Sequence, residues 1–165
     1  MGDDKSIFPM IPVMYNILLA DDDIDDRYFF DKALKALHLQ IRLTTVNNGE
    51  ELMTYLSENS KHLPDVLFLD LNMPRKNGSE CLSEIKHNQK LKRLPVIIHS
   101  TSMHDDLADE LYNKGALNYL QKTNVTELQK NLHDVLTLIM PTTFIAALYA
   151  RWIIILEKYL IKLVS

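Results

Sequence analysis

Five short apolar runs alternate with stretches of helical periodicity, and this alternation constrains the fold of the chain more than any other feature. The runs span residues 15–20, 41–46, 66–70, 95–100 and 118–122. Three of them are almost continuously apolar, as expected for strands that are covered on both faces. Five successive strand–helix units predict a doubly wound α/β fold, in which a five-stranded parallel sheet has helices on both faces.

The segments between the runs carry apolar residues at the spacing of a helix face. The first four contain Phe30, Ala33, Leu34 and Leu37; Leu52, Met53 and Leu56; Leu82 and Ile85; and Leu107, Ala108, Leu111 and Tyr112. The fifth shows the pattern most clearly, with Leu128, Leu132, Val135, Leu136 and Ile139. We expect Asn124 to be the N-cap of this fifth helix, Glu127 to complete a capping box, and Gly115 to end the fourth helix.

Composition and charge narrow the class of protein. A chain of 165 residues is long enough for one domain with a substantial core. Its formal net charge of −4 argues against nucleic-acid binding, which normally needs a basic face. The single cysteine, Cys81, excludes an internal disulfide, and no leader is apparent, so we expect a cytoplasmic protein. The histidines lack metal-site spacing; we expect His99 to have a core or strand-edge role and Cys81 to be packed in the core.

Polar side chains stand where the apolar runs end. Asp21 and Asp22 follow the first run directly, and Asp70 ends the third. The fourth run ends at Ser100 and the fifth at Lys122. In open α/β sheets the ligand crevice lies beyond the carboxyl ends of the strands, so we expect these side chains to meet there.

The chemistry of these side chains favours phosphoryl transfer. Carboxylates gathered at one site repel each other unless a cation binds them, and oxygen ligands of this kind suit Mg²⁺. A lysine and a hydroxyl beside the metal can neutralise and orient a phosphoryl group. A carboxylate can itself be the nucleophile, so Asp70 is predicted to be a phosphoryl acceptor. For Asp25 and Asp26, farther along, we favour a structural role, because acids in a helix's first turn complement its dipole.

Four motifs together resemble a known family. The segments "ILLADDD", "VLFLDLNMPRKNG", "PVIIHSTS" and "ALNYLQK" are similar, in order and approximate spacing, to the motifs of receiver domains from bacterial two-component response regulators. The resemblance covers about residues 15–139 and is strongest to small stand-alone regulators, including those associated with phytochrome-type kinases. It implies a flavodoxin-like sheet with strand order 2-1-3-4-5.

The resemblance also implies a metal site around the acceptor Asp70. In that reading Mg²⁺ is bound directly by Asp22, by Asp70 and by the backbone carbonyl of Asn72. Asp21 holds the metal through water.

Further roles implied by the resemblance fall on the fourth and fifth strands. Ser100 is the hydroxyl that closes on the phosphoryl group, Lys122 is its cationic partner, and Tyr119 is the switch aromatic. The family usually has proline after the lysine, commonly joined by a cis peptide bond, whereas this chain has Thr123. A cis bond to a non-proline residue costs about 2.5–4 kcal/mol, so we expect a trans link.

The predicted function is that of a non-enzymatic response regulator. It accepts a phosphoryl group from a sensor histidine kinase or phosphotransfer protein and signals by contacts with a downstream protein. One alternative is a haloacid-dehalogenase-type phosphohydrolase, whose nucleophile opens the motif order and is followed two places later by an aspartate. Here the acidic pair comes first, and Asn72 occupies that later position. A second alternative is a docking module that works without phosphate. The presence of suitable residues at all five key positions argues against it.

The predicted domain is flanked by two extensions. We expect an N-terminal tail at 1–14, a receiver domain at 15–140 and an apolar helical extension at 141–165. In the last segment Ile145, Trp152 and Tyr159 recur every seven residues, and Arg151 interrupts the apolar sequence, which argues against a transmembrane span. We expect this helix to mediate a homodimer. Binding to a membrane surface and a non-native extension remain open alternatives.

Overall fold

The computed structural model describes residues 14–101 and 105–140. Within these ranges five strands alternate with five helices. The elements are β1 (Tyr15–Ala20), α1 (Ile24–Lys35), β2 (Ile41–Val46), α2 (Gly49–Glu58), β3 (Val66–Leu69), α3 (Gly78–His87), β4 (Val96–Ser100), α4 (Asp105–Asn113), β5 (Asn118–Gln121) and α5 (Val125–Ile139).

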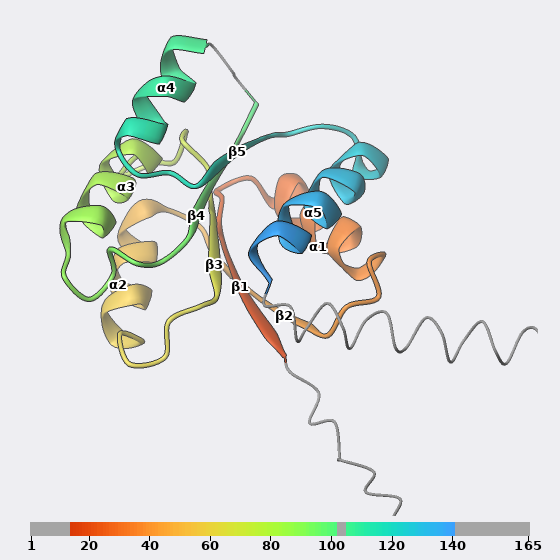
Figure 1. Cartoon of the computed structure of the whole chain (residues 1–165), viewed down its shortest axis with the longest axis horizontal. Coiled ribbons are helices and arrows are strands. Elements are labelled where there is room, and N and C mark those ends of the chain that lie inside the picture. The colour runs from red at the N-terminus through yellow and green to blue at the C-terminus, as the bar shows by residue number, and fades with distance from the viewer. Residues whose placement is uncertain (1–13, 102–104, 141–165) are drawn as a thin grey trace, which may run out of the picture.

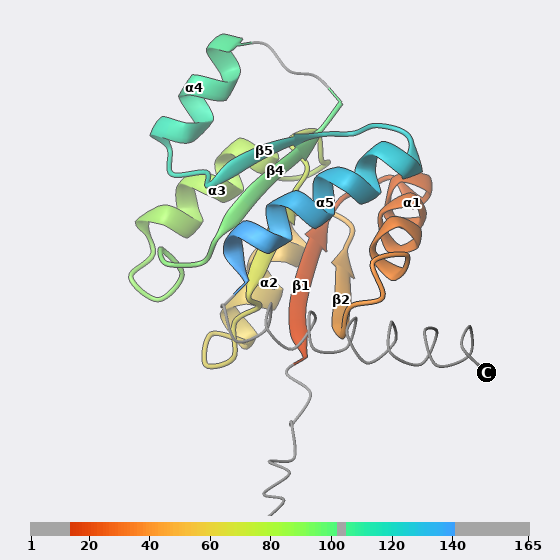
Figure 2. The same ribbon diagram turned by 45° about the vertical axis from the view of Figure 1, so that its right-hand side comes forward.

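The strands form one parallel sheet in the order β2-β1-β3-β4-β5. Helices α1 and α5 cover one face of the sheet, and α2, α3 and α4 lie on the other (Figure 1, Figure 2). The predicted doubly wound fold and its strand order are therefore confirmed.

Side chains of each inner strand alternate between two hydrophobic clusters, one on each face of the sheet. In β1, Ile17 and Leu19 pack toward the cluster that contains Phe30 of α1, whereas Leu18 and Ala20 pack toward α2 and α3. Full burial of one large apolar side chain contributes roughly 1.5–3 kcal/mol to folding. Because both faces are covered, the inner strands carry apolar residues at successive positions, which explains their continuous runs.

The element boundaries agree with the sequence to within a residue at the strand ends. Asp70 and Lys122 lie just after β3 and β5 rather than inside them, and β4 begins after Pro95. His99 and Cys81 are buried, as expected. Tyr112 departs from expectation: it is 46% exposed, and its hydroxyl contacts the Asn118 side chain at 3.3 Å instead of packing in the core.

Helix ends differ from the prediction in one respect. Asn124 caps α5 by accepting a hydrogen bond from the Glu127 backbone amide at 3.1 Å. Among the described residues the reciprocal bond that would complete a capping box is absent there. The complete capping box occurs instead at the start of α3, between Asn77 and Glu80. Gly115 follows α4 with a φ of 97°, a conformation that glycine adopts without strain.

The extensions predicted at 1–14 and 141–165 lie outside the described residues, apart from Met14. In the part of the chain that is described, no helix combines the length and the apolar content needed to cross a bilayer. All peptide bonds of the described backbone are trans, including the Lys122–Thr123 link, as expected.

Candidate functional site

Strand register brings the first two acids together. Ala20, the last residue of β1, is paired with Leu69, the last residue of β3. Asp21 and Asp70 therefore leave the sheet at the same level, and the Asp70 amide donates a hydrogen bond to the Ala20 carbonyl at 2.9 Å. Both acids are almost completely buried, with 0% and 3% of their surfaces exposed. Two buried carboxylates side by side need a cation or hydrogen-bond donors to compensate them.

Lys122 supplies that compensation from the end of β5. Its amide donates to the Ser100 carbonyl at 2.9 Å, which fixes its backbone next to the end of β4. The Nζ atom lies 2.9 Å from Oδ2 of Asp21 and 3.3 Å from Oδ2 of Asp70. A third carboxylate, that of Asp26 in α1, lies 2.8 Å from the same Nζ. One ammonium thus joins the two central strands, the edge strand and the first helix.

The buried charges perturb one another. Burial raises the pKa of Asp21 above its ordinary value, although the hydrogen bond with Lys122 acts in the opposite direction. Burial alone would lower the pKa of Lys122, but its hydrogen bonds with Asp21 and Asp26 hold that pKa above the ordinary range. Lys122 is therefore a permanent cation at neutral pH.

An oxygen cluster suitable for a divalent cation stands at the same place. One carboxylate oxygen from each of Asp21, Asp22 and Asp70 lies within 4.8 Å of the other two. Asp22 is exposed, which leaves the cluster open to solvent on one side. Hard oxygen ligands with an open side fit Mg²⁺, which keeps several waters and takes one or two carboxylates. The residues present therefore fit the metal that the sequence predicts.

The start of α1 is fixed to the end of β1. The Asp23 amide donates to Asp21 Oδ1 at 3.0 Å, and Asp23 caps the helix by accepting from the amides of Asp25 and Asp26. The Arg27 guanidinium donates to the Asp21 carbonyl at 2.7 Å. These bonds hold the first turn of α1 beside the acidic cluster.

His99 lies behind the cluster in β4. It is 1% exposed, its ring meets Phe30 edge to face at 5.3 Å, and its Nδ1 is 4.0 Å from Asp21 Oδ2. Burial, and then the charge of Lys122, lower its pKa to about 3. The ring is therefore neutral at neutral pH and adds no second cation to the site.

Ser100 and Tyr119 adjoin the cluster from β4 and β5. Ser100 is completely buried, and its Oγ has no hydrogen-bond partner among the described residues. The Tyr119 hydroxyl donates to the Ser100 carbonyl at 3.1 Å. The hydroxyl residue and the switch aromatic that the resemblance implies are thus joined by a direct hydrogen bond.

The loop after β3 returns tightly across the acceptor. The Gly78 amide donates to the Leu71 carbonyl at 3.0 Å, and a Cβ at Gly78 would come within 2.1 Å of the Asp70 carbonyl oxygen. Only glycine permits this approach. Asn72 is exposed in the same loop.

The structure brings together Asp21, Asp22, Asp70 and Lys122 by direct distances. It locates Ser100 at the end of β4, Tyr119 within β5 and Asn72 in the loop after β3. Sequence reasoning missed the role of Asp26, which it assigned to the helix dipole. Asp26 does lie in the first turn of α1, as expected, but the sequence pattern does not tell which acid of that turn faces the site.

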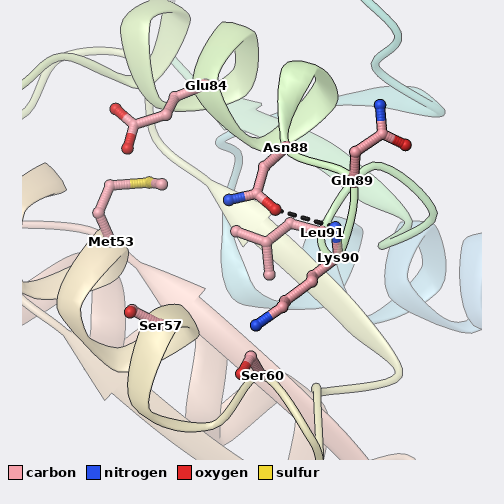
Figure 3. A pocket seen from close by; sticks show the side chains of 8 residues that line it. All are labelled: Met53, Ser57, Ser60, Glu84, Asn88, Gln89, Lys90 and Leu91. Carbon is pink, nitrogen blue, oxygen red and sulfur yellow. Dashed lines mark hydrogen bonds between the residues drawn. The ribbon is translucent and has the colours of Figure 1, made fainter.

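A cavity lies away from this site. It has a volume of about 360 Å³ and is lined by α2 and by the segment from α3 to β4, including Met53, Ser57, Glu84 and Lys90 (Figure 3). The C-terminal ends of these helices lie near the amino ends of the strands, whereas the acidic cluster lies at the carboxyl ends. The cavity is therefore separate from the acidic cluster.

Comparison with known proteins is consistent with this geometry. Residues 17–133 match the response regulator receiver domain. The chain is 32% identical over 124 residues to the response regulator Rcp1 of Synechocystis sp. (strain ATCC 27184 / PCC 6803 / Kazusa). The alignment covers 72% of this chain and 84% of Rcp1.

Solved structures agree. The Mn²⁺-bound form of Rcp1 matches with a TM-score of 0.66 and 32% identity, over 74% of this chain and 92% of that one. The phosphorylated cyanobacterial phytochrome response regulator RcpA matches with a TM-score of 0.71 and 32% identity, over 79% of this chain and 96% of that one. The chain therefore belongs to the response regulator receiver domain family, whose members accept a phosphoryl group in two-component signalling.

Proposed function

We propose that Asp70 is the phosphoryl acceptor of this receiver. The observation that carries the proposal is the position of the Asp70 carboxylate, which is buried at the end of β3, 3.3 Å from the Lys122 ammonium. Asp21 and Asp22 offer oxygens within 4.8 Å of it, and the exposed Asp22 leaves the cluster open to solvent. A nucleophile, a cation and metal-binding oxygens thus meet at one point, as phosphoryl transfer requires.

The transfer is a displacement at phosphorus. A carboxylate oxygen of Asp70 forms the new O–P bond while the N–P bond of a donor phosphohistidine breaks. The electron pair of the broken bond returns to the imidazole nitrogen of the donor. Lys122 neutralises charge on the phosphoryl oxygens, and Ser100 donates its hydroxyl hydrogen to one of them.

The proposed metal ligands are Asp22, Asp70 and the backbone carbonyl of Asn72, with Asp21 holding the metal through water. When bound, Mg²⁺ neutralises charge on the transferred group. The oxygen cluster described above supports this assignment, as does the Mn²⁺-bound structure reported for the relative Rcp1.

The donor surface that we propose is the exposed face of α1. Ile24 and Tyr28 are 72% and 60% exposed, and Phe29 is 42% exposed with its ring against that of Tyr28. These apolar side chains follow directly on the acidic cluster in the sequence and lie on the helix that Asp23 caps. A histidine kinase or phosphotransfer protein that covers them would bring its phosphohistidine to Asp70.

The output that we propose is protein contact rather than catalysis. Ser100 and Tyr119 carry it, because the hydroxyl that closes on the phosphoryl group belongs to the residue whose carbonyl binds the tyrosine. We propose a cytoplasmic location, as is usual for this family. Residues 15–140 are the proposed receiver, consistent with the match over 17–133, and residues 141–165 the proposed dimer-forming extension.

The test is phosphorylation followed by intact mass. The full chain is incubated with acetyl phosphate and Mg²⁺, and we expect one added phosphoryl group. Asp70→Asn should abolish the addition, and Asp22→Ala should strongly reduce both labelling and Mg²⁺ affinity. Asp65→Asn, which removes an exposed carboxylate just before β3, is the matched control and should label normally. Labelling of the Asp70→Asn chain at the wild-type rate would contradict the assignment.

The phosphohydrolase alternative is not favoured. Its acid/base position is held here by an amide, Asn72, and the chain matches receivers over most of its length.

A further inference from the structure

The Lys122 ammonium lies closer to two other carboxylates than to the acceptor. The Nζ distances are 2.8 Å to Asp26, 2.9 Å to Asp21 and 3.3 Å to Asp70. Asp21 is part of the metal cluster. Asp26 is not: it stands in α1, and the sequence separation between it and Lys122 is 96 residues. The shortest contact of the ammonium is thus made to a carboxylate outside the metal cluster.

The position of Asp26 is fixed by its surroundings. Its amide is bound by the N-cap carboxylate of Asp23 at 3.2 Å. Its neighbour Arg27 joins α1 to the Asp21 carbonyl at 2.7 Å. The Lys122 side chain is only 9% exposed, so water screens its contact with Asp26 much less than it screens a surface ion pair.

An ammonium group has three N–H donors, and Asp26 and Asp21 occupy the two shortest contacts. A phosphoryl group on Asp70 brings additional negative charge that the same ammonium must neutralise. The third donor is available to Asp70, so the competition is one of position: moving the ammonium closer to that group lengthens its 2.8 Å contact with Asp26. The bond between Lys122 and Asp26 is charge-assisted, and such bonds are about twice as strong as neutral ones. Weakening it therefore adds to the free-energy barrier for phosphoryl transfer to Asp70.

We propose that Asp26 is a positioning residue that holds Lys122 in a resting place and thereby slows phosphorylation of Asp70. This rests on the proposed function, in which Asp70 accepts the phosphoryl group and Lys122 neutralises it. Asp26 sets how readily the receiver is activated without itself touching the phosphoryl group. The other partners of Lys122 cannot play this part, because Asp21 and Asp70 belong to the site itself.

The variants are Asp26→Asn and the matched control Asp25→Asn. Each removes one negative charge from the same turn of α1 and keeps the shape of the side chain, but Asp25 is exposed and has no contact with Lys122. A third variant, Asp26→Glu, keeps the charge. With acetyl phosphate and saturating Mg²⁺, we expect Asp26→Asn to label about three- to tenfold faster than wild type. Asp25→Asn and Asp26→Glu should stay within about twofold of it.

A second readout needs neither metal nor phosphoryl donor. In metal-free protein, the NMR signals of the Lys122 side-chain Cε and Nζ should shift in Asp26→Asn and stay in place in Asp25→Asn. Equal labelling rates for Asp26→Asn and Asp25→Asn, or unchanged Lys122 signals in Asp26→Asn, would overturn the proposal. Failure of the proposed function is distinct, because labelling would then be absent from wild type or would survive in Asp70→Asn.

Discussion

At the scale of single residues, Lys122 balances more negative charge than any other side chain of the site. Its ammonium contacts three carboxylates, of which Asp21 and Asp70 are buried. Removing one partner of a buried ion pair leaves an uncompensated charge, and this is more destabilising than losing the pair altogether. The lysine is thus expected to matter for folding as well as for phosphoryl transfer.

Lys122→Met should therefore destabilise the metal-free protein. We expect the free energy of unfolding at neutral pH to fall by about 3 kcal/mol. Urea denaturation in the presence of EDTA measures it, and added Mg²⁺ should recover part of the loss by binding the same carboxylates. Lys35→Met is the control, because the exposed pair of Lys35 with Asp31 contributes less than about 1 kcal/mol. Equal losses in the two variants would contradict the expectation.

Ionisation of Cys81 is expected to lower the stability of the folded protein at alkaline pH. Burial raises the pKa of its thiol from 9.0 to about 11. Below pH 9 the thiol is neutral in both folded and unfolded chains, so its contribution to stability is fully present. Above pH 9 the unfolded thiol ionises first, and stability should be lost at up to about 1.4 kcal/mol per pH unit until the folded pKa is reached.

Urea denaturation between pH 8 and pH 11 tests this loss of stability, with Cys81→Ala as reference. The wild-type curve should fall more steeply than that of the variant across the window. Burial, and then the charge of Asp65, also raise the pKa of Tyr15 to about 12, so both proteins share a further loss above pH 10. Parallel curves for the two proteins would show that the thiol titrates normally.

At the scale of elements, the loop between β3 and α3 is tightly constrained at Gly78. Gly78→Ala should displace the Asp70 backbone, because the new Cβ would lie 2.1 Å from its carbonyl oxygen and 2.8 Å from the Leu71 Cα. We expect a loss of about 2 kcal/mol or more in unfolding free energy together with slower phosphorylation.

Gly115→Ala separates the two effects. It strains the backbone at a φ of 97° after α4, at a loss of about 1 kcal/mol, without touching the acceptor loop. Its labelling rate by intact mass should match wild type. A Gly78→Ala protein with the wild-type rate would mean that the loop does not position Asp70.

The ends of β4 and β5 form the proposed switch. Beryllofluoride with Mg²⁺, a phosphoryl mimic, should shift the NMR signals of Ser100 and Tyr119 together, because Tyr119 is bonded to the Ser100 carbonyl. In Ser100→Ala the hydroxyl that meets the mimic is absent, and the Tyr119 shift should shrink. Unchanged Tyr119 signals in the wild-type protein on addition of the mimic would exclude the switch.

Elements were easier to predict than the contacts between them. The proximity of Asp21 and Asp70 could be predicted, because adjacent parallel strands end at the same edge of the sheet. The contact of Asp26 with Lys122 did not follow, since it depends on the rotation of α1 about its axis. The periodicity that places Phe30 on the buried face gives that rotation only approximately, too coarsely to tell which acid of the first turn meets Lys122.

At the scale of the whole molecule, the described residues account for the sheet and both hydrophobic clusters without residues 141–165. Met140, the last described residue, is buried beside α5 and β1. A chain truncated after Met140 should thus keep its fold and its labelling by acetyl phosphate. If the apolar extension mediates the proposed dimer, sedimentation should find the full chain dimeric and the truncated chain monomeric. Equal association of both chains would remove the extension from the interface.

The position of Lys122, directly after β5 and beside Asp70, also couples signalling competence to the completeness of folding. The carboxylates of the site come from the first half of the chain, and their cation arrives only with the fifth strand, 96 residues after Asp26. During synthesis or refolding, a chain without β5 in place has an acceptor that lacks the fixed ammonium of Lys122. We therefore expect such an intermediate to be a poor phosphoryl acceptor, so that competence for phosphorylation is acquired only when the fold is complete.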